Sequence, residues 1–356
     1  MTTTTTTYRR TALVLPLPTL AHILDPTPYS HPIRIALWET TDSLSIIFTS
    51  PLFRPDGPIG SNRLAAWETL QRFLGCVYGF ASQEAMRVGR VAMGVDVLME
   101  GWGGDDGEGW VDGTWDRVVG VDINIDSIFA KPLSIPITSI PALRPPGQSI
   151  IPSPHPRSTY PSSLVDGKYP VVALGGTFDH IHAGHKILLS MAVWITGRKL
   201  IVGISADDLL VSKAHSEHLE PLELRIERTR EFLHLLEPRL EYDLVELRDV
   251  AGPTGTDPDV QALVVSRESA SGGDAIAAIR KDRNLPPLDV YVIDVISSST
   301  DSLIPITEGA DGSANGNAAS TSLVGETDQR RLKEGKMSSS YIRKWLAEGG
   351  EAGGIA

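Results

Sequence analysis

A doubly wound, parallel α/β sheet is the fold that the sequence predicts for residues 166–350 of this 356-residue chain. Short apolar runs rich in β-branched residues recur along this half, as in strands that are buried on both faces. They alternate with segments whose apolar residues recur at helical spacing, which is the pattern of βαβ crossovers. The first run, residues 171–174, stops at two glycines, and a helix-like segment follows that ends at Gly197.

The remaining elements of this half follow in regular order. Strands are expected at residues 199–205, 240–247, 260–266 and 288–296, and helices at about 221–236 and 273–284. A last helix is expected over residues 341–346, capped by one of the serines just before it. In a parallel sheet of this kind, the ligand binds beside the carboxyl ends of the strands.

The N-terminal half is predicted to be a smaller, mixed α/β domain of unknown role, residues 11–130. Its strands are expected at residues 12–15, 33–38, 44–49, 91–98 and 118–123, and one long helix at 61–88. The glycine-rich acidic segment 101–110 could hold a metal ion, but it lacks the register of an EF-hand loop. An acidic surface loop is the preferred interpretation.

Three further segments are expected to lack regular structure. Residues 1–10 form a disordered tip that is rich in threonine. Residues 131–165 are crowded with proline and serine and form a linker, which contains the domain boundary. Residues 307–327 are rich in Gly, Ala, Ser and Asn and form a flexible insertion in the C-terminal domain.

Composition limits the partners and the compartment. The net charge of -12 argues against binding to nucleic acid or to anionic membranes, but it is compatible with a small anionic substrate. A single cysteine, Cys76, excludes an intrachain disulfide and suits a reducing compartment. No apolar run reaches the roughly 18 residues that span a bilayer. A cytoplasmic protein is therefore expected.

The stretch GGTFDHIHAGH, residues 175–185, carries the side chains from which chemistry is expected. A glycine turn that leads into a helix start is an anion site, because the first N–H groups of a helix have no internal partner. His182 and His185 would project to the same side, and Gly184 would let a ligand approach closely. Two imidazoles there could donate hydrogen bonds to a phosphate. A capped helix with incidental histidines is the alternative, and a zinc site is weaker because no closed ligand set accompanies them.

Two further features could complete such a site. Lys213 follows the second strand of this half and could neutralise a phosphate, with a solvated surface lysine as the alternative. Near the C-terminus, the segment KMSSSYIR places three serines at a second helix start, with Lys336 and Arg343 nearby. Taken alone, the serines are also explained by a simple helix cap.

Two motifs carry a resemblance to a known family. GTFDHIHAGH resembles the signature of the HxGH nucleotidyltransferases, and KMSSSYIR resembles their ISSTxxR motif. Between them, GPTGTDP and VVSRESASGG are similar to segments of eukaryotic-type, fungal-like phosphopantetheine adenylyltransferases. The resemblance covers about residues 169–350. It implies a Rossmann-like domain that transfers AMP from ATP to 4′-phosphopantetheine, giving dephospho-CoA and pyrophosphate in coenzyme A synthesis.

The same resemblance implies roles for particular residues. The catalytic residues would be His182, His185, Lys213 and Thr177. The ATP phosphates would be held by Gly175, Gly176, Thr177, Phe178, Gly184, His185, Ser338, Ser339, Ser340 and Arg343. The 4′-phosphopantetheine would be held by Lys213, Arg267 and Arg280, although the RGLR-type segment of bacterial relatives is replaced here by SRES. Magnesium, as Mg²⁺, would enter with ATP, and Asp179, Asp207 and Asp208 could support it or cap turns.

Other functions stay open. Another HxGH transferase would use FMN, NMN or glycerol phosphate as the acceptor, and a sensor would bind a nucleotide or coenzyme A without turnover. The expected partners are the small molecules ATP and 4′-phosphopantetheine, with other enzymes of coenzyme A synthesis as further candidates. Some relatives join this domain to a dephospho-CoA kinase. No kinase step is expected here, because the sequence contains no GxxxxGK[ST] phosphate loop.

Overall fold

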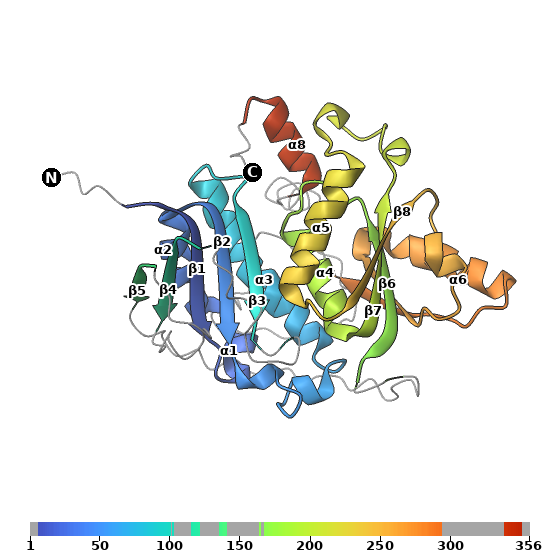
Figure 1. Cartoon of the computed structure of the whole chain (residues 1–356), viewed down its shortest axis with the longest axis horizontal. Helices are drawn as coiled ribbons and strands as arrows, with labels where there is room; N and C mark the ends of the chain where they lie inside the picture. Colours follow the sequence, from blue (N-terminus) through green and yellow to red (C-terminus); the bar gives the residue numbers. More distant parts are fainter. Residues whose placement is uncertain are drawn as a thin grey trace, which may run out of the picture.

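The computed structural model describes residues 6–100, 102, 115–121, 135–140, 164, 167–293 and 338–350. Within this part, the chain forms two parallel sheets of five strands each, one in each half (Figure 1). The parallel α/β fold predicted for the C-terminal half is confirmed. The N-terminal half, expected to be mixed, is a parallel α/β unit as well.

The N-terminal sheet has the order β3-β2-β1-β4-β5. Its strands are β1 (Tyr8–Pro16), β2 (Thr40–Thr49), β3 (Gly94–Met99), β4 (Arg117–Val121) and β5 (Ile137–Ile140). Its helices are α1 (Leu20–Leu24), α2 (Ser30–Trp38) and α3 (Trp67–Arg87). The prediction of a strand at residues 33–38 is wrong, because Ile33, Ala36 and Leu37 recur at helical spacing and bury one face of α2.

Two predicted boundaries of this half are also wrong. Strand β1 begins at Tyr8, inside the predicted disordered tip, because it pairs with β2 from that residue on. Strand β5 lies inside the predicted linker of residues 131–165 and pairs with β4. Four residues beside a proline-rich stretch are too short a run to show a clear period.

The C-terminal sheet has the order β10-β9-β6-β7-β8. Its strands are β6 (Tyr169–Gly176), β7 (Thr196–Ser205), β8 (Glu241–Leu247), β9 (Ala262–Ser266) and β10 (Asp289–Ile293). Its helices are α4 (Ala183–Ile195), α5 (Leu222–Leu236), α6 (Ala270–Asp282) and α8 (Ser339–Ala347). The predicted insertion 307–327 lies outside the described residues, as does segment 101–110 apart from Trp102. No helix in the described part of the chain is both long and apolar enough to cross a membrane.

Both sheets follow the same strand order. Counted from the first strand of each half, the order is third, second, first, fourth, fifth. A sheet of this kind has its ligand crevice between the first and fourth strands, where the direction of the crossovers reverses. In the C-terminal sheet this point lies between β6 and β9, which pair directly. The glycine turn after β6 therefore opens at the switch point of the sheet.

Helix α4 lies between the two sheets (Figure 1). Every residue from Lys186 to Ile195 is buried. Helix α3 of the N-terminal half packs against α4. The largest fully buried side chain, Trp194, contacts the rings of Phe53 and Trp102, whose centroids lie 6.0 Å and 5.0 Å away. One apolar core thus includes residues of both halves, and both halves place the helix that carries the two histidines.

Buried tyrosines predict a loss of stability at alkaline pH. Burial raises the pKa of Tyr29, Tyr78 and Tyr242 above the usual value near 10. In the unfolded chain these phenols ionise near pH 10, whereas in the folded protein they stay neutral above that pH. Their contribution to the free energy of unfolding is therefore fully present below pH 10 and is lost as the pH rises above it. We expect the free energy of unfolding to fall by about 1.4 kcal/mol per buried tyrosine for each pH unit above 10.

Urea denaturation at several pH values between about 9 and 11 measures this slope. In Tyr29→Phe, the hydroxyl that donates to the carbonyl oxygen of Pro16 at 2.8 Å is lost. That variant should show a shallower slope than the wild type. An identical slope in the two proteins would contradict the assignment for Tyr29.

Candidate active site

The glycine turn after β6 is built around a buried aromatic ring. Phe178 follows Gly175 and Gly176 with a φ of 52° and is fully buried. A β-carbon on Gly176 would come within 3.1 Å of the Phe178 ring, so the glycine lets this ring fold back onto the strand end. The ring lies 5.2 Å from that of His185. The side chain of Phe178 therefore supports the histidine from inside, and only its backbone can meet a bound nucleotide.

His182 and His185 lie together at the start of α4. His182 is the N-cap, and its Nδ1 accepts a hydrogen bond from the N–H of Gly184 at 3.1 Å. Since Nδ1 accepts, the neutral ring carries its proton on Nε2, which can donate to a phosphate oxygen. The two rings stack with centroids 4.1 Å apart. A β-carbon on Gly184 would come within 3.0 Å of Cε1 of His182, so this cap requires the glycine.

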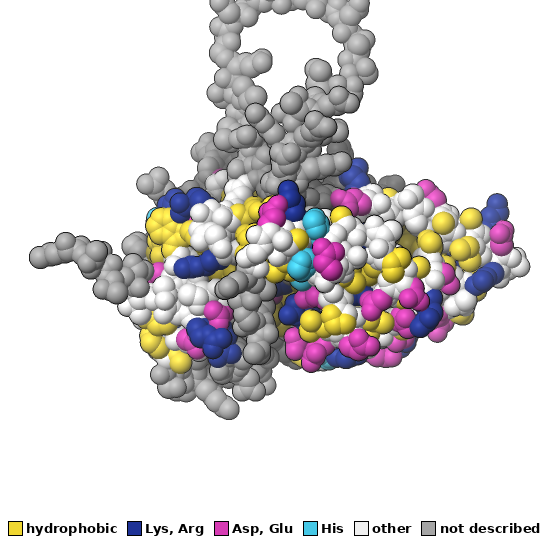
Figure 2. Space-filling model, turned by 90° about the horizontal axis from the view of Figure 1, so that it is seen from above, with side chains coloured by type: hydrophobic (Ala, Val, Ile, Leu, Met, Phe, Trp, Pro, Cys, Tyr) yellow, Lys and Arg dark blue, Asp and Glu magenta, His cyan; other side chains and the backbone are white. Residues whose placement is uncertain are grey.

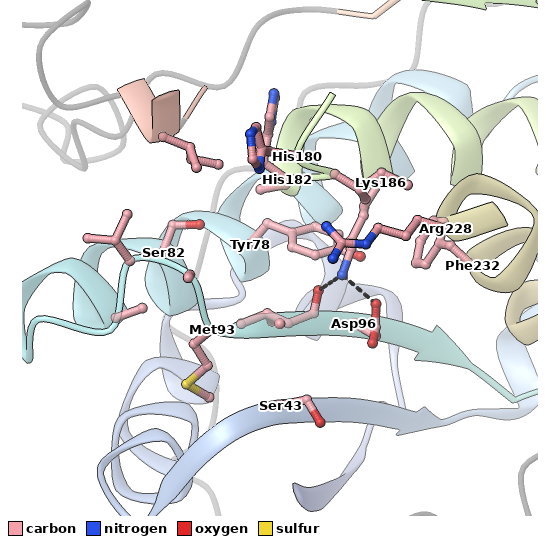
Figure 3. A pocket seen from close by; sticks show the side chains of 18 of the residues that line it. Ser43, Tyr78, Ser82, Met93, Asp96, His180, His182, Lys186, Arg228 and Phe232 are labelled. Carbon is pink, nitrogen blue, oxygen red and sulfur yellow. Dashed lines mark hydrogen bonds and ion pairs between the residues drawn. The ribbon is translucent and has the colours of Figure 1, made fainter. Parts of the chain in front are cut away.

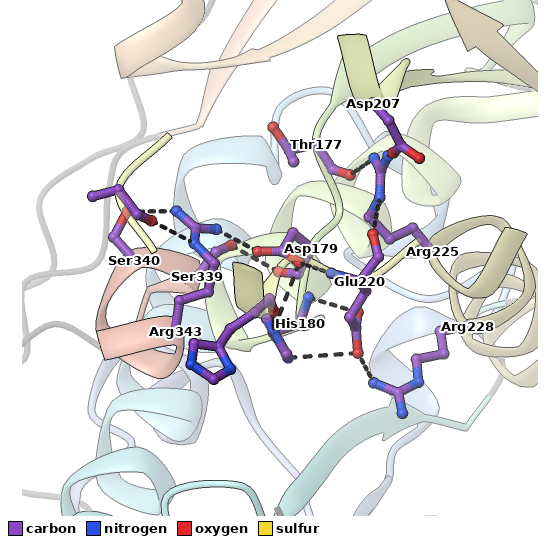
Figure 4. A network of polar contacts seen from close by, with 12 residues as sticks. Thr177, Asp179, His180, Asp207, Glu220, Arg225, Arg228, Ser339, Ser340 and Arg343 are labelled. Carbon is purple, nitrogen blue, oxygen red and sulfur yellow. Dashed lines mark hydrogen bonds and ion pairs between the residues drawn. The ribbon is translucent and has the colours of Figure 1, made fainter. Parts of the chain in front are cut away.

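The second helix start, that of α8, lies against the same loop (Figure 4). The hydroxyl of Ser339 donates to the backbone carbonyl of Asp179 at 2.7 Å. Ser338 caps α8 by accepting a hydrogen bond from the N–H of Tyr341 at 3.3 Å. The predicted meeting of the glycine turn with the serine motif is therefore present in the structure. Both helix starts favour anions at this place.

Arg343 fastens α8 to this loop. Its side chain is only 2% exposed and forms an ion pair with Asp179, which is fully buried. It also donates to the carbonyl oxygen of Ala214 at 3.0 Å and to the hydroxyl of Ser340 at 3.2 Å. Through these contacts Arg343 positions the serines. That it also holds the ATP phosphates stays a prediction.

Asp179 also belongs to a buried cluster of charged groups (Figure 4). Its Oδ1 accepts from the N–H of Glu220 at 2.9 Å. Glu220 accepts from the N–H of His180 at 2.8 Å and pairs with Arg228. One ligand atom from each of Asp179, His180 and Glu220 lies within 4.8 Å of the others, as metal ligands would. Because these carboxylates already pair with arginines and N–H groups, the cluster fits a scaffold for the loop and not a cation site.

A fully buried arginine, Arg225, joins the ends of the two central strands. It donates to the carbonyl oxygen of Thr177 at 2.7 Å and to that of Ser205 at 2.9 Å. It also pairs with Asp207, which belongs to the loop after β7. No motif marks this residue. Its only signal in the sequence is a charged residue on the buried side of α5, where it must find partners inside the protein.

Lys213 and Arg267 lie on opposite sides of the glycine turn. Lys213 follows β7, between the short helices η6 (Asp207–Leu209) and η7 (Ser216–His218), and is exposed. Arg267 opens the short helix η9 (Arg267–Ser269) directly after β9 and is exposed as well. Since β7 and β9 both pair with β6, the two cations lie at the carboxyl edge of the sheet. Both stay candidates for binding phosphate.

Arg280, expected as a candidate for holding 4′-phosphopantetheine, lies away from the glycine turn. It is 1% exposed and donates to the backbone carbonyl oxygens of Thr254 at 2.6 Å, Pro286 at 2.7 Å and Asp257 at 2.9 Å. A fourth, longer contact reaches the carbonyl oxygen of Val260, which precedes β9. The guanidinium therefore lies near the amino end of that strand. Arg280 ties loops together at the edge of the sheet opposite to the candidate site.

Arg280→Met is expected to reduce stability without weakening acceptor binding. The change leaves several buried carbonyl oxygens without donors, which should cost about 3 kcal/mol of unfolding free energy. Urea denaturation and acceptor titrations measure the two quantities. Arg267→Met is the matched control, because it should raise the KM for the acceptor with little loss of stability. An equal rise in KM in both variants would contradict this assignment.

The surface around the two helix starts has mixed charge. Figure 2 shows histidine side chains at the surface in the middle of this face, beside both basic and acidic side chains. His182 and His185 are themselves partly exposed. Although the net charge of the chain is -12, histidine and basic side chains that can donate hydrogen bonds lie around the two helix starts, as an anionic substrate requires.

A comparison with protein families agrees with this geometry. The sequence model of the cytidylyltransferase-like family matches residues 173–344. These residues run from the middle of β6, through the two stacked histidines, into the helix that follows the serines. With its parallel sheet and two helix starts on one loop, the C-terminal half contains a domain similar to the cytidylyltransferase-like family.

Curated relatives narrow this class. A phosphopantetheine adenylyltransferase of Saccharomyces cerevisiae is 49% identical over 129 residues, which are 36% of this chain and 42% of the relative. One from Methanothermobacter thermautotrophicus is 37% identical over 139 residues, which are 39% of this chain and 80% of the relative. One from Pyrococcus abyssi is 34% identical over 131 residues, which are 37% of this chain and 82% of the relative. The chain belongs to the phosphopantetheine adenylyltransferase family, although its match spans only about two fifths of the yeast relative.

Proposed function

We propose that this chain transfers AMP from ATP to 4′-phosphopantetheine, forming dephospho-CoA and releasing pyrophosphate. The observation that carries the proposal is the hydrogen bond from Ser339 to Asp179, which brings two anion-binding helix starts onto one loop. A triphosphate presents anionic groups in a row, and two helix starts that share a loop can bind successive groups. The activity for which the archaeal relatives are named supports this choice of donor and acceptor.

The reaction needs no general base. The phosphate of 4′-phosphopantetheine is already an anion at neutral pH, and one of its oxygens attacks the α-phosphorus of ATP. As that P–O bond forms, the bond from the α-phosphorus to the oxygen that bridges to the β-phosphorus breaks. The bridging oxygen leaves with the electron pair as part of pyrophosphate. Catalysis then consists of in-line alignment and stabilisation of negative charge.

The residues of the site divide this work. His182, through Nε2–H, and His185 hold oxygens of the α-phosphate. The N–H groups at the start of α8 and the hydroxyls of Ser338 and Ser340 hold the β- and γ-phosphates and then the leaving pyrophosphate, while the hydroxyl of Ser339 keeps this helix start on the loop. Lys213 and Thr177 orient the attacking phosphate, with Arg267 as a further cation on the opposite side. Mg²⁺ enters with ATP, coordinated by phosphate oxygens and water.

The experiment that tests the proposal is pyrophosphate release from ATP and Mg²⁺, with the second product identified by mass. Release that depends on 4′-phosphopantetheine and yields dephospho-CoA is the expected result. FMN, NMN and glycerol phosphate, each with ATP and with CTP, form the acceptor controls. Release with one of these alone would assign the chain to another nucleotidyl transfer. Binding of ATP without release in any arm would make it a sensor.

The same experiment addresses one finer expectation, and two others need measurements of their own. The absence of coenzyme A among the products would support the expectation that no dephospho-CoA kinase step accompanies the transfer. Pull-down with other enzymes of coenzyme A synthesis would test them as partners. The cytoplasmic location stays a prediction from composition, to be tested by microscopy of a tagged chain.

A further inference from the structure

The N-terminal sheet holds the helix of the two histidines by a partly buried ion pair near its start. Lys186 lies one helical turn after His182, whose carbonyl oxygen accepts its N–H at 3.0 Å. The Lys186 ammonium lies 2.6 Å from Oδ1 of Asp96 and 2.8 Å from the carbonyl oxygen of Val95 (Figure 3). Both acceptors belong to β3, the edge strand of the N-terminal sheet. The start of α4 is therefore tied to the other half of the chain.

A second contact holds the far end of the same helix. The Nε1–H of Trp194 donates to the carbonyl oxygen of Arg63 at 2.9 Å. The guanidinium of Arg63 lies 4.1 Å from the centre of the Trp194 ring and donates to its carbonyl oxygen at 3.4 Å. Burial lowers the pKa of Arg63 to about 10. The N-terminal half thus contacts α4 at both ends. These contacts fix the position of the helix along its own axis.

Apolar packing does not fill the space around the first of these contacts. A cavity of about 570 Å³ lies between β3 and α3 on one side and α4, α5 and α8 on the other (Figure 3). Tyr78, Phe232 and Trp345 line it together with His182, Lys186 and Asp96. Side chains do not pack tightly across this cavity, so the contacts of the Lys186 ammonium with Asp96 and with the carbonyl oxygen of Val95 link β3 to the start of α4.

The N-terminal half has no comparable phosphate turn of its own at the corresponding place. Its first strand ends at Pro16 and is followed by Leu17, Pro18 and Thr19, whereas β6 ends in two glycines. Proline has no N–H, so neither the last residue of β1 nor Pro18 can donate to a phosphate. The N–H of Leu17 is used by the carbonyl oxygen of Thr49. The shared strand order therefore does not bring a second nucleotide site of the same kind.

We infer that the N-terminal half is the platform that sets the position of the histidine pair, and that Asp96 is a positioning residue that acts through Lys186. The effect on turnover rests on the proposed function, whereas the effect on the two imidazoles does not. Without the ion pair, the first turn of α4 can shift toward the cavity. A shift of that kind moves His182 and His185 relative to the α8 start, and alignment at a reacting phosphate is sensitive to small displacements.

The test uses the full chain with Asp96→Asn, Asp96→Glu and Asp42→Asn. Asp42 is the matched control, because it pairs with Arg9 at 2.7 Å on the same sheet but at an exposed position. Asp96→Asn is expected to lower kcat for pyrophosphate release about tenfold, with KM for ATP changed less than about twofold. Asp96→Glu should recover part of the loss, and Asp42→Asn should match the wild type.

Nuclear magnetic resonance of the histidine rings gives a readout that does not depend on activity. Asp96→Asn should shift the signals of His182 and His185 but not that of His31, which is exposed on α2. Lys186→Met is the second variant, in case Asp96→Asn fails to fold, and should give the same shifts. Unchanged ring signals in the folded variant would overturn the inference, whether or not the wild type turns over. Normal kcat in an active protein would overturn it as well.

Discussion

Replacing His185 by alanine is expected to lower the turnover number about 10²- to 10³-fold, the usual loss when a donor to transition-state charge is removed. The ring stacks on His182 at 4.1 Å and is supported by Phe178, so its position at the start of α4 is well defined. The N-cap contact of His182 with Gly184 does not involve His185, and the ring of Phe178 is fully buried, so the fold should persist. Initial rates of pyrophosphate release measure the effect, and circular dichroism checks the fold.

Two further variants sharpen this result. His31→Ala removes an exposed histidine from α2 in the N-terminal half and should leave turnover unchanged. His185→Gln keeps a hydrogen-bond donor and should recover part of the lost rate. Turnover of His185→Ala within about twofold of the wild type would remove this residue from the transition state.

Replacing Asp179 by asparagine is expected to have the largest effect on stability. The change leaves Arg343 buried without its counter-charge, and breaking a buried ion pair from one side costs about 3–5 kcal/mol. Helix α8 should then lose its place against the loop, with a loss of turnover. Urea denaturation measures the first effect and pyrophosphate release the second. Asp179→Asn combined with Arg343→Met should be less destabilised than the sum of the two single variants.

Lys344→Met is the control for this second prediction. Lys344 is the next residue on the same helix and pairs with Glu348. The side chain of Lys344 is 62% exposed and that of Glu348 is 65% exposed. An exposed pair of this kind contributes at most about 1 kcal/mol. Equal destabilisation by Asp179→Asn and Lys344→Met would show that the buried pair does not hold α8.

Local patterns made the fold of the C-terminal half predictable. A strand that ends in two glycines, a histidine N-cap and an apolar helix are all coded within residues 169–197, where side-chain spacing decides the structure. The serine cap of α8 is local in the same sense. The prediction of a strand at residues 33–38 failed because a short apolar run fits both the strand period and the helix period. In the structure, this segment is a helix that packs against α3.

Contacts between distant residues were not predictable from one sequence. The pair of Arg343 with Asp179 joins residues 164 positions apart, and that of Lys186 with Asp96 joins residues 90 apart. No local pattern marks the two partners of such a pair. Arg280 shows the same limit in another way. It follows a family motif in the sequence, but the sequence does not show that its guanidinium donates to four backbone carbonyl oxygens at the opposite edge of the sheet. Family motifs locate the site but do not separate the groups that touch the ligand from those that hold them.

The most direct test of the proposed adenylyl transfer is to follow radioactive phosphorus from ATP labelled at the α- or the γ-position. With 4′-phosphopantetheine as the acceptor, the α-label should appear in dephospho-CoA and the γ-label only in pyrophosphate. This result requires attack at the α-phosphorus, whose oxygens are proposed to be held by His182 and His185 at the start of α4. Label from the γ-position in the acceptor, or no transfer of either label, would contradict adenylyl transfer by this chain.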